Sequence, residues 1–157
     1  MSRRGVYLSV AVLATTLLTG AAAPGDKELL DATKRGDVAA VRSLLEEGAD
    51  PNVSQGDGMS ALHLAAQKGN VDILNVLLEA GATVGAKTRI GDYTPLHLAS
   101  WGAHTSSVSA LIEAGANPGI VTTTSGVTPL HLAAKATNGE STVRALLERG
   151  APVDALE

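Results

Sequence analysis

The feature that most limits what this chain can fold into is a repeat with a period of about 34 residues. A seven-residue block that begins with Ser or Thr recurs at this interval, at residues 60–66, 94–100 and 128–134. A second block, Leu-Leu/Ile-Glu-x-Gly-Ala, recurs out of phase with it at residues 44–49, 77–82, 111–116 and 146–151. Self-similarity at such a period indicates a solenoid, in which each unit buries its apolar face against its neighbours.

Each unit predicts two helices followed by a hairpin. The hydroxyl of Thr94 can cap a first helix, and Pro95 follows at the first helical position, where a missing N–H has no cost. The second helix shows apolar residues at i, i+3 and i+4, such as Leu74, Leu77 and Leu78, which predicts one buried face. A Gly then ends the helix, and the polar stretch that follows favours a projecting hairpin or loop.

The two blocks, Thr-Pro-Leu-His-Leu-Ala and Leu-Leu-Glu-x-Gly-Ala, resemble the ankyrin repeat. The resemblance covers roughly residues 26–157. It implies an all-α fold, an ankyrin-repeat solenoid of stacked helix-turn-helix units with projecting hairpin loops. We expect one ankyrin repeat domain over residues 23–157, with four repeats at about 26–57, 58–91, 92–125 and 126–157.

The first and last repeats differ. Repeat one has a more polar first helix, with Lys27, Glu28, Asp31 and Lys34, as suits the end of a stack. The last repeat keeps an ordinary apolar face, although a stack normally closes with a polar unit. Three interpretations stay open: the chain is a fragment of a longer protein, its end frays, or this edge docks a partner or a second copy of the chain.

Residues 1–22 are expected to be a secretory signal peptide. Arg3 and Arg4 precede an uncharged, largely apolar run over residues 6–18, and small residues follow, with cleavage expected after Ala22. The run is shorter than the roughly 20 residues that a membrane span needs. The sequence therefore predicts export, to a periplasm or as a secreted protein. The alternatives are an uncleaved leader, which alone would give membrane contact, and a buried first helix.

Charge and cysteine content exclude several classes of partner and site. Without Arg3 and Arg4 the chain has 10 Lys and Arg against 16 Asp and Glu, with no basic cluster, which argues against binding nucleic acid. The absence of cysteine rules out disulfides, thiolate catalysis and thiolate zinc sites.

The evenly spaced His63, His97 and His131 suggest a metal site, but their spacing comes from the repeat and no acidic cluster accompanies them. The ankyrin resemblance implies instead that such rings hydrogen-bond backbone in the turns between repeats. His104 is expected to begin a second helix, with no site role.

No catalytic motif is present, and no cofactor or metal is expected. The chain is therefore predicted not to be an enzyme but a protein–protein interaction module or scaffold in an extracytoplasmic compartment. The alternative is an N-terminal fragment or accessory domain of a larger protein whose activity lies beyond Glu157.

By the ankyrin resemblance, partners bind a concave face made of the hairpin tips and the exposed positions of the first helices. Trp101 is the only Trp, and Tyr93 is the only Tyr outside the leader; both fall on this face, and interface hot spots are enriched in Trp and Tyr. The alternative is that Trp101 fills the space beside Gly102 and lies flat against its neighbours. The candidate partner-binding residues are Met59, Gln67, Lys68, Arg89, Ile90, Tyr93, Trp101, Val127 and Lys135.

Overall fold

The computed structural model describes residues 25–153, which form eight helices and, within that range, no strand. The helices are α1 (Asp26–Arg35), α2 (Val38–Glu46), α3 (Ala61–Lys68), α4 (Val71–Glu79), α5 (Pro95–Trp101), α6 (Thr105–Glu113), α7 (Pro129–Lys135) and α8 (Glu140–Glu148). The leader predicted at residues 1–22 lies outside the described residues. The expected all-α solenoid is confirmed.

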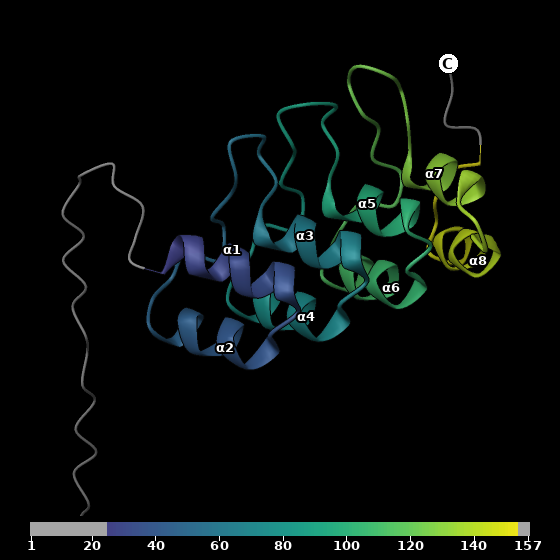
Figure 1. Cartoon of the computed structure of the whole chain (residues 1–157). Helices are drawn as coiled ribbons and strands as arrows, with labels where there is room; N and C mark the ends of the chain where they lie inside the picture. The colour runs from purple at the N-terminus through teal and green to yellow at the C-terminus, as the bar shows by residue number, and fades with distance from the viewer. Residues whose placement is uncertain (1–24, 154–157) are drawn as a thin grey trace, which may run out of the picture.

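The helices form two layers, as Figure 1 shows. The first helices of the repeats, α1, α3, α5 and α7, lie side by side in one layer, and the second helices, α2, α4, α6 and α8, lie side by side in the other. Hairpins project from the first-helix layer between successive repeats. Each helix packs on its partner within the repeat and on its counterparts in adjacent repeats, which is the contact pattern of a solenoid.

The predicted helix starts are confirmed. Ser60 Oγ accepts a hydrogen bond from the His63 N–H (3.4 Å), and Thr128 Oγ1 accepts one from the His131 N–H (3.2 Å). Pro95 occupies the first position of α5, directly after Thr94. These local contacts satisfy backbone groups that a helix end leaves unpaired.

The turn between the two helices of each repeat contains a residue with a positive φ angle, although that residue is not always glycine. Gly36 and Gly69 adopt positive φ angles of 76° and 67°, the conformation that favours glycine. Ala103 occupies the same place in repeat three with φ 55°. Repeat four has the predicted extra residue: four residues, 136–139, separate α7 from α8, and Asn138 takes the positive φ of 60°.

The core consists of thin layers of aliphatic side chains. Its largest fully buried members include Leu29, Leu62, Ile73, Leu77, Leu96 and Leu111. The chain contains no Phe, so Leu, Val, Ile and Ala fill the space between the two helix layers. None of the described helices is long and apolar enough to cross a membrane.

Adjacent hairpins are tied to one another. The Arg89 N–H donates to the Asp57 carbonyl (2.8 Å), and the Arg89 guanidinium Nη1 donates to the Gly56 carbonyl (3.0 Å). The Thr123 hydroxyl donates to the Asp92 carboxylate one hairpin further along. The hairpins therefore form one continuous edge above the first helices.

Candidate functional site

Two of the repeated histidines link successive repeats. Nδ1 of His63 accepts a hydrogen bond from the Ser60 N–H (3.2 Å), so the proton of the neutral ring lies on Nε2, which donates to the Tyr93 carbonyl (3.0 Å). His97 repeats this arrangement with the Thr94 N–H (3.2 Å) and the Val127 carbonyl (3.1 Å). The two rings thus hold the hairpins that carry Tyr93 and Val127 in place.

Burial decides the protonation of these rings. Both His63 and His97 are fully buried, and this desolvation lowers the pKa of each below its usual value of 6.5, although the hydrogen bonds to the Tyr93 and Val127 carbonyls partly oppose the shift. A neutral ring is what the observed bonds require. Within residues 25–153, no group of three or more His, Cys, Asp or Glu side chains is placed to hold a metal ion.

The exposed feature of the same region is an aromatic groove, which we define by its lining residues Gln67, Leu98, Trp101 and Gly102. It encloses about 330 Å³ and lies across the ends of α3 and α5. The Trp101 side chain is 60% exposed, which leaves much of its ring open to a partner. Such exposure of the largest apolar side chain in the chain is uncommon for a residue whose only role is packing.

Tyr93 supports Trp101 from the hairpin side. The two ring centroids are 6.4 Å apart, and the Tyr93 ring also meets His97 edge-on at 5.7 Å. The Tyr93 N–H donates to Thr88 Oγ1 (3.0 Å), which fixes the base of the hairpin. The aromatic pair predicted from the sequence is therefore brought together, with Tyr93 half-buried and Trp101 outermost.

His104 lies outside the groove but links the two helix ends beside it, which the sequence did not indicate. It begins α6 as its N-cap, as predicted, but its ring also reaches repeat two, where Nε2 lies 3.0 Å from the Gln67 carbonyl oxygen. The ring sits so close to Gly69 and Gly102 that a Cβ at either glycine would overlap it. His104 thus holds the α3 end that carries Gln67 against the α5 end that carries Trp101. The signal that could have found it is the change at this N-cap position, which holds Asp37 and Asn70 in the first two repeats.

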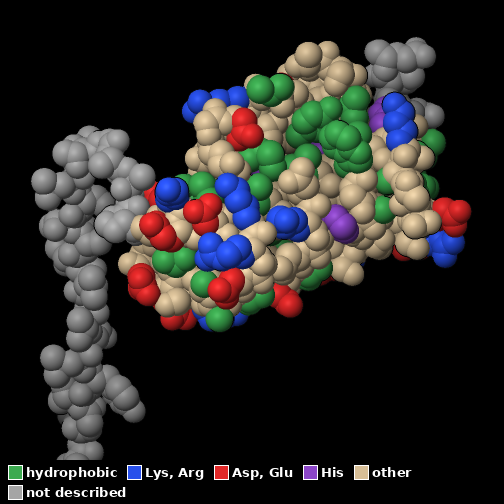
Figure 2. Space-filling view, in the orientation of Figure 1, with side chains coloured by type: hydrophobic (Ala, Val, Ile, Leu, Met, Phe, Trp, Pro, Cys, Tyr) green, Lys and Arg blue, Asp and Glu red, His purple; other side chains and the backbone are tan. Residues whose placement is uncertain are grey.

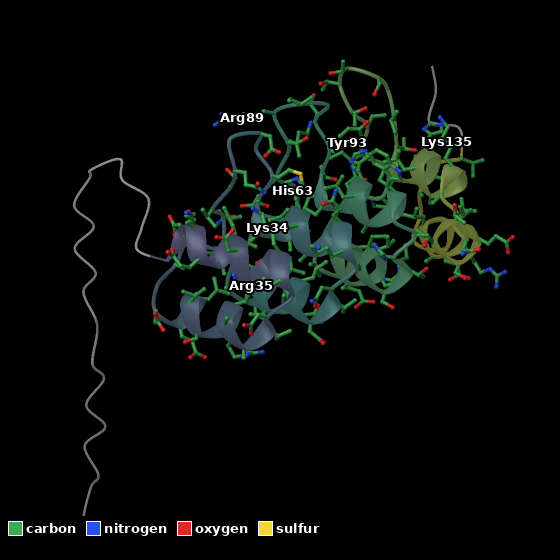
Figure 3. All side chains as sticks on the ribbon, in the orientation of Figure 1. Lys34, Arg35, His63, Arg89, Tyr93 and Lys135 are labelled. Atoms are coloured by element: carbon green, nitrogen blue, oxygen red, sulfur yellow. The ribbon has the colours of Figure 1, made fainter. Side chains whose placement is uncertain are left out.

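The predicted first-helix residues lie where the sequence placed them. Gln67, Lys68, Trp101 and Lys135 are all exposed at the C-terminal ends of α3, α5 and α7. Together with the hairpins, the exposed sides of α1, α3, α5 and α7 form what we call the first-helix face. Figure 3 shows Lys34 and Arg35 at one end of this face, Lys135 at the other, and Tyr93 between them.

The predicted hairpin residues differ from one another in exposure and in their contacts within the fold. Ile90 is 78% exposed at a hairpin tip, which suits contact with a partner. Arg89 is exposed but already bonded to the neighbouring hairpin. Met59 and Val127 are half-buried, because Met59 packs against the core and Val127 lies where its carbonyl meets His97. These three residues thus have contacts within the fold, and their role in binding a partner stays a prediction.

Charge is divided between the two layers. The first helices carry five Lys and Arg against three Asp and Glu, whereas the second helices carry two Lys and Arg against six Asp and Glu. Helices α3, α5 and α7 contain no acidic residue at all. Figure 2 shows basic and acidic side chains interspersed over the earlier repeats and a hydrophobic patch towards the later ones. The face is thus more basic than the rest of an acidic protein.

A stack of helix-turn-helix units with hairpins along one edge defines a solenoid repeat protein, and the class of site is an open face across several repeats. The family comparison is consistent with that geometry: a family model described as ankyrin repeats (3 copies) matches residues 29–122 and 93–156. The chain belongs to the ankyrin repeat family. Ankyrin repeats are modules for protein–protein interaction.

Similar segments occur in several curated proteins. The chain is 48% identical over 58 residues to 2-5A-dependent ribonuclease of Mus musculus, which covers 36% of this chain and 8% of that protein. It is 49% identical over 49 residues to ankyrin repeat domain-containing protein 46 of Rattus norvegicus, covering 31% of this chain and 22% of that protein. It is 42% identical over 64 residues to GA-binding protein subunit beta-2 of Mus musculus, covering 41% and 15%. The matched segments thus span less than a quarter of each of these relatives.

Proposed function

We propose that this protein binds another protein through the first-helix face, with Trp101 as the central contact, and that it does so without catalysis. The single observation that carries the proposal is the exposed Trp101 at the aromatic groove, with the Tyr93 ring 6.4 Å away. A large aromatic side chain on a rigid platform next to a hollow is typical of an interface hot spot. No cofactor or metal enters this proposal.

Site-specific photo-crosslinking in the native host tests the proposal. A photoreactive residue replaces Gln67 in the groove, and the matched control replaces Asn75, which is exposed on the second helix α4. We expect a discrete protein adduct at position 67 and none at position 75. Adding Trp101→Ala should remove the adduct, because truncation of a hot-spot residue weakens binding by about 2 kcal/mol or more.

The result that would overturn the proposal is equally specific. An adduct at position 67 that persists unchanged with Trp101→Ala would show that the groove does not anchor the partner. Circular dichroism of the variant is the control for folding, since an exposed Trp101 contributes little to the core.

The compartment is a separate proposal, supported by the signal-peptide pattern of residues 1–22. We infer that the protein is exported, to a periplasm or outside the cell, and meets its partner there. The intact mass of the protein from each cell fraction tests this: export predicts a chain that begins at Ala23. A chain that retains residues 1–22 and stays in the cytoplasmic fraction would contradict it.

Two other interpretations remain to be tested. The small share of each relative that the chain matches is consistent with a repeat segment of a larger protein, whose activity would lie beyond Glu157. The coding sequence downstream of Glu157 decides this. The other interpretation is self-association through the last repeat. An apparent molar mass, measured by light scattering, that rises with protein concentration would support it.

A further inference from the structure

We propose that the first-helix face binds an extended acidic segment of its partner, with one apolar side chain in the aromatic groove and carboxylates on the cations to either side. This inference rests on the proposed function of the groove and adds the chemistry of what enters it. It follows from the register of side chains across the four repeats and from the division of charge between the two layers.

The register places one apolar anchor in a row of polar and basic side chains. Lys34, Gln67, Trp101 and Lys135 occupy equivalent positions near the C-terminal ends of α1, α3, α5 and α7. Lys68 is the next residue after Gln67, so cations lie beyond the groove on both sides of it. A chain that crosses the first helices therefore meets a cation, the groove and a second cation in order.

The cations of this row are available to a ligand. Lys68 and Lys135 are exposed and form no ion pair within residues 25–153. Lys34 pairs only with the partly exposed Asp31, at 3.7 Å, and such surface pairs are weak. Helices α3 and α5, which carry the groove, and the neighbouring α7 contain no carboxylate. Each helix of the second layer contains at least one.

The acidic side chains of the adjacent hairpins are already engaged. The Asp57 carboxylate accepts a hydrogen bond from the Met59 N–H (2.9 Å), and the Asp92 carboxylate accepts one from the Thr123 hydroxyl. Neither carboxylate forms an ion pair with Lys68. The charge that complements this row is therefore negative and has to come from the ligand.

The spacing of the helices sets the spacing of the ligand. Packed helices lie about 8–10 Å apart, and an extended chain rises about 3.3 Å per residue, so about three residues span one helix-to-helix step. The matching segment has an apolar residue in the middle and acidic residues about three positions before and after it. The groove volume of about 330 Å³ accommodates one aliphatic side chain.

The intrinsic fluorescence of the protein reports this binding directly, because Trp101 is the only Trp. The probe is a synthetic peptide in a Gly/Ser background, with a central Leu and pairs of Glu about three residues to either side. We expect it to change the Trp101 emission in a saturable way, with affinity that falls as salt is raised. A peptide with Lys in place of Glu and a peptide with Gly in place of Leu should each bind at least about tenfold more weakly.

Charge reversal maps the contact. Lys68→Glu and Lys135→Glu should each lower the affinity for the acidic peptide about fivefold, as expected for the loss of one exposed ion pair. Arg144→Glu is the matched control, since Arg144 is an exposed cation of the same repeat as Lys135 but lies on the second helix α8. It should leave the affinity unchanged.

Several results would overturn the inference while leaving the proposed function intact. These are the absence of any emission change with the acidic peptide, equal affinity for the acidic and basic peptides, or a stronger response to a single-stranded oligonucleotide. In each case a Trp101-dependent adduct at position 67 would still support a protein partner of different chemistry. Loss of that dependence would instead overturn the proposed function itself.

Discussion

Repeats three and four share the sequence Thr-Pro-Leu-His-Leu-Ala but lie in different surroundings. The first helix of repeat three, α5, packs between α3 and α7, whereas α7 packs against α5 alone among the described first helices. Leu96 and His97 of α5 are fully buried. Their equivalents in α7 differ: Leu130 is half-buried and His131 is exposed. Identical local sequence therefore gives different burial, because each repeat is covered by the next one.

The same contrast appears in the hydrogen bonds. His131 keeps the local contacts of the capping box, with Nδ1 accepting from the Thr128 N–H (3.2 Å). Its Nε2 has no carbonyl partner within residues 25–153, whereas His63 and His97 each bond the following hairpin. A hollow of about 990 Å³ runs along α7 and α8, beside Leu147, which is 41% exposed. The repeat sequence alone does not make its histidine a link between repeats. The histidine becomes one only where a following repeat packs over it and offers a carbonyl.

The largest expected effect comes from truncating the covered leucine. Leu96→Ala should lower the free energy of unfolding by about 3 kcal/mol, because it leaves a cavity in a fully buried site. Leu130→Ala, at the equivalent but half-buried position, should cost about half as much. Urea unfolding followed by circular dichroism measures both. Equal losses would show that the last repeat is as well packed as the third.

Removing the linking histidine should have the next largest effect. His97→Ala leaves the Val127 carbonyl without its donor and opens a cavity, which should cost about 2–3 kcal/mol. His131→Ala removes only the capping contacts at an exposed site and should cost about 1 kcal/mol. The difference between the two urea midpoints is the measurement. If His131→Ala proved the more damaging, the linking role of His97 would be wrong.

Acid should destabilise the protein through the covered histidines. The folded pKa of His63 and of His97 lies below 6.5, so the unfolded chain binds more protons in this range and the free energy of unfolding falls as pH is lowered through about 6.5. At pH values above the unfolded pKa of about 6.5, both rings are neutral in the folded and the unfolded chain, and the free energy of unfolding no longer depends on their protonation. Urea midpoints between about pH 7.5 and 5.5 should show this slope, before most carboxylates titrate.

A double variant tests whether the two covered rings cause that slope. His63→Ala/His97→Ala should lose it. A slope that survives in the double variant would place its origin in other groups.

The smallest effect concerns a hydroxyl in a covered position. Ser100 is fully buried and its Oγ has no hydrogen-bond partner within residues 25–153, while repeats two and four have Ala66 and Ala134 at this place. Ser100→Ala should therefore raise the free energy of unfolding by up to about 1 kcal/mol. The reverse change at the exposed site, Ala134→Ser, should shift it by less than about 0.5 kcal/mol. A loss of stability with Ser100→Ala would show that the hydroxyl has a role in the fold.

Much of the fold could be predicted because its determinants are local. Thr128 caps its helix through contacts within three residues, and Gly69 reverses the chain through its own backbone angle. The extra residue before Glu140 lengthens one turn, as its sequence indicated. The aromatic pair Tyr93 and Trp101 could be placed on one face because the repeat register fixes which side of the helix each residue occupies.

The sequence alone thus determined the repeat period, the helix ends and the face on which Trp101 lies, since these depend on residues a few positions apart. Only the tertiary structure decided that Trp101 stands exposed beside a groove and that His104 bonds the Gln67 carbonyl of the preceding repeat. It also decided that His97 is buried while His131 is not. These properties join residues of different repeats, and solvation of a side chain depends on which neighbour covers it.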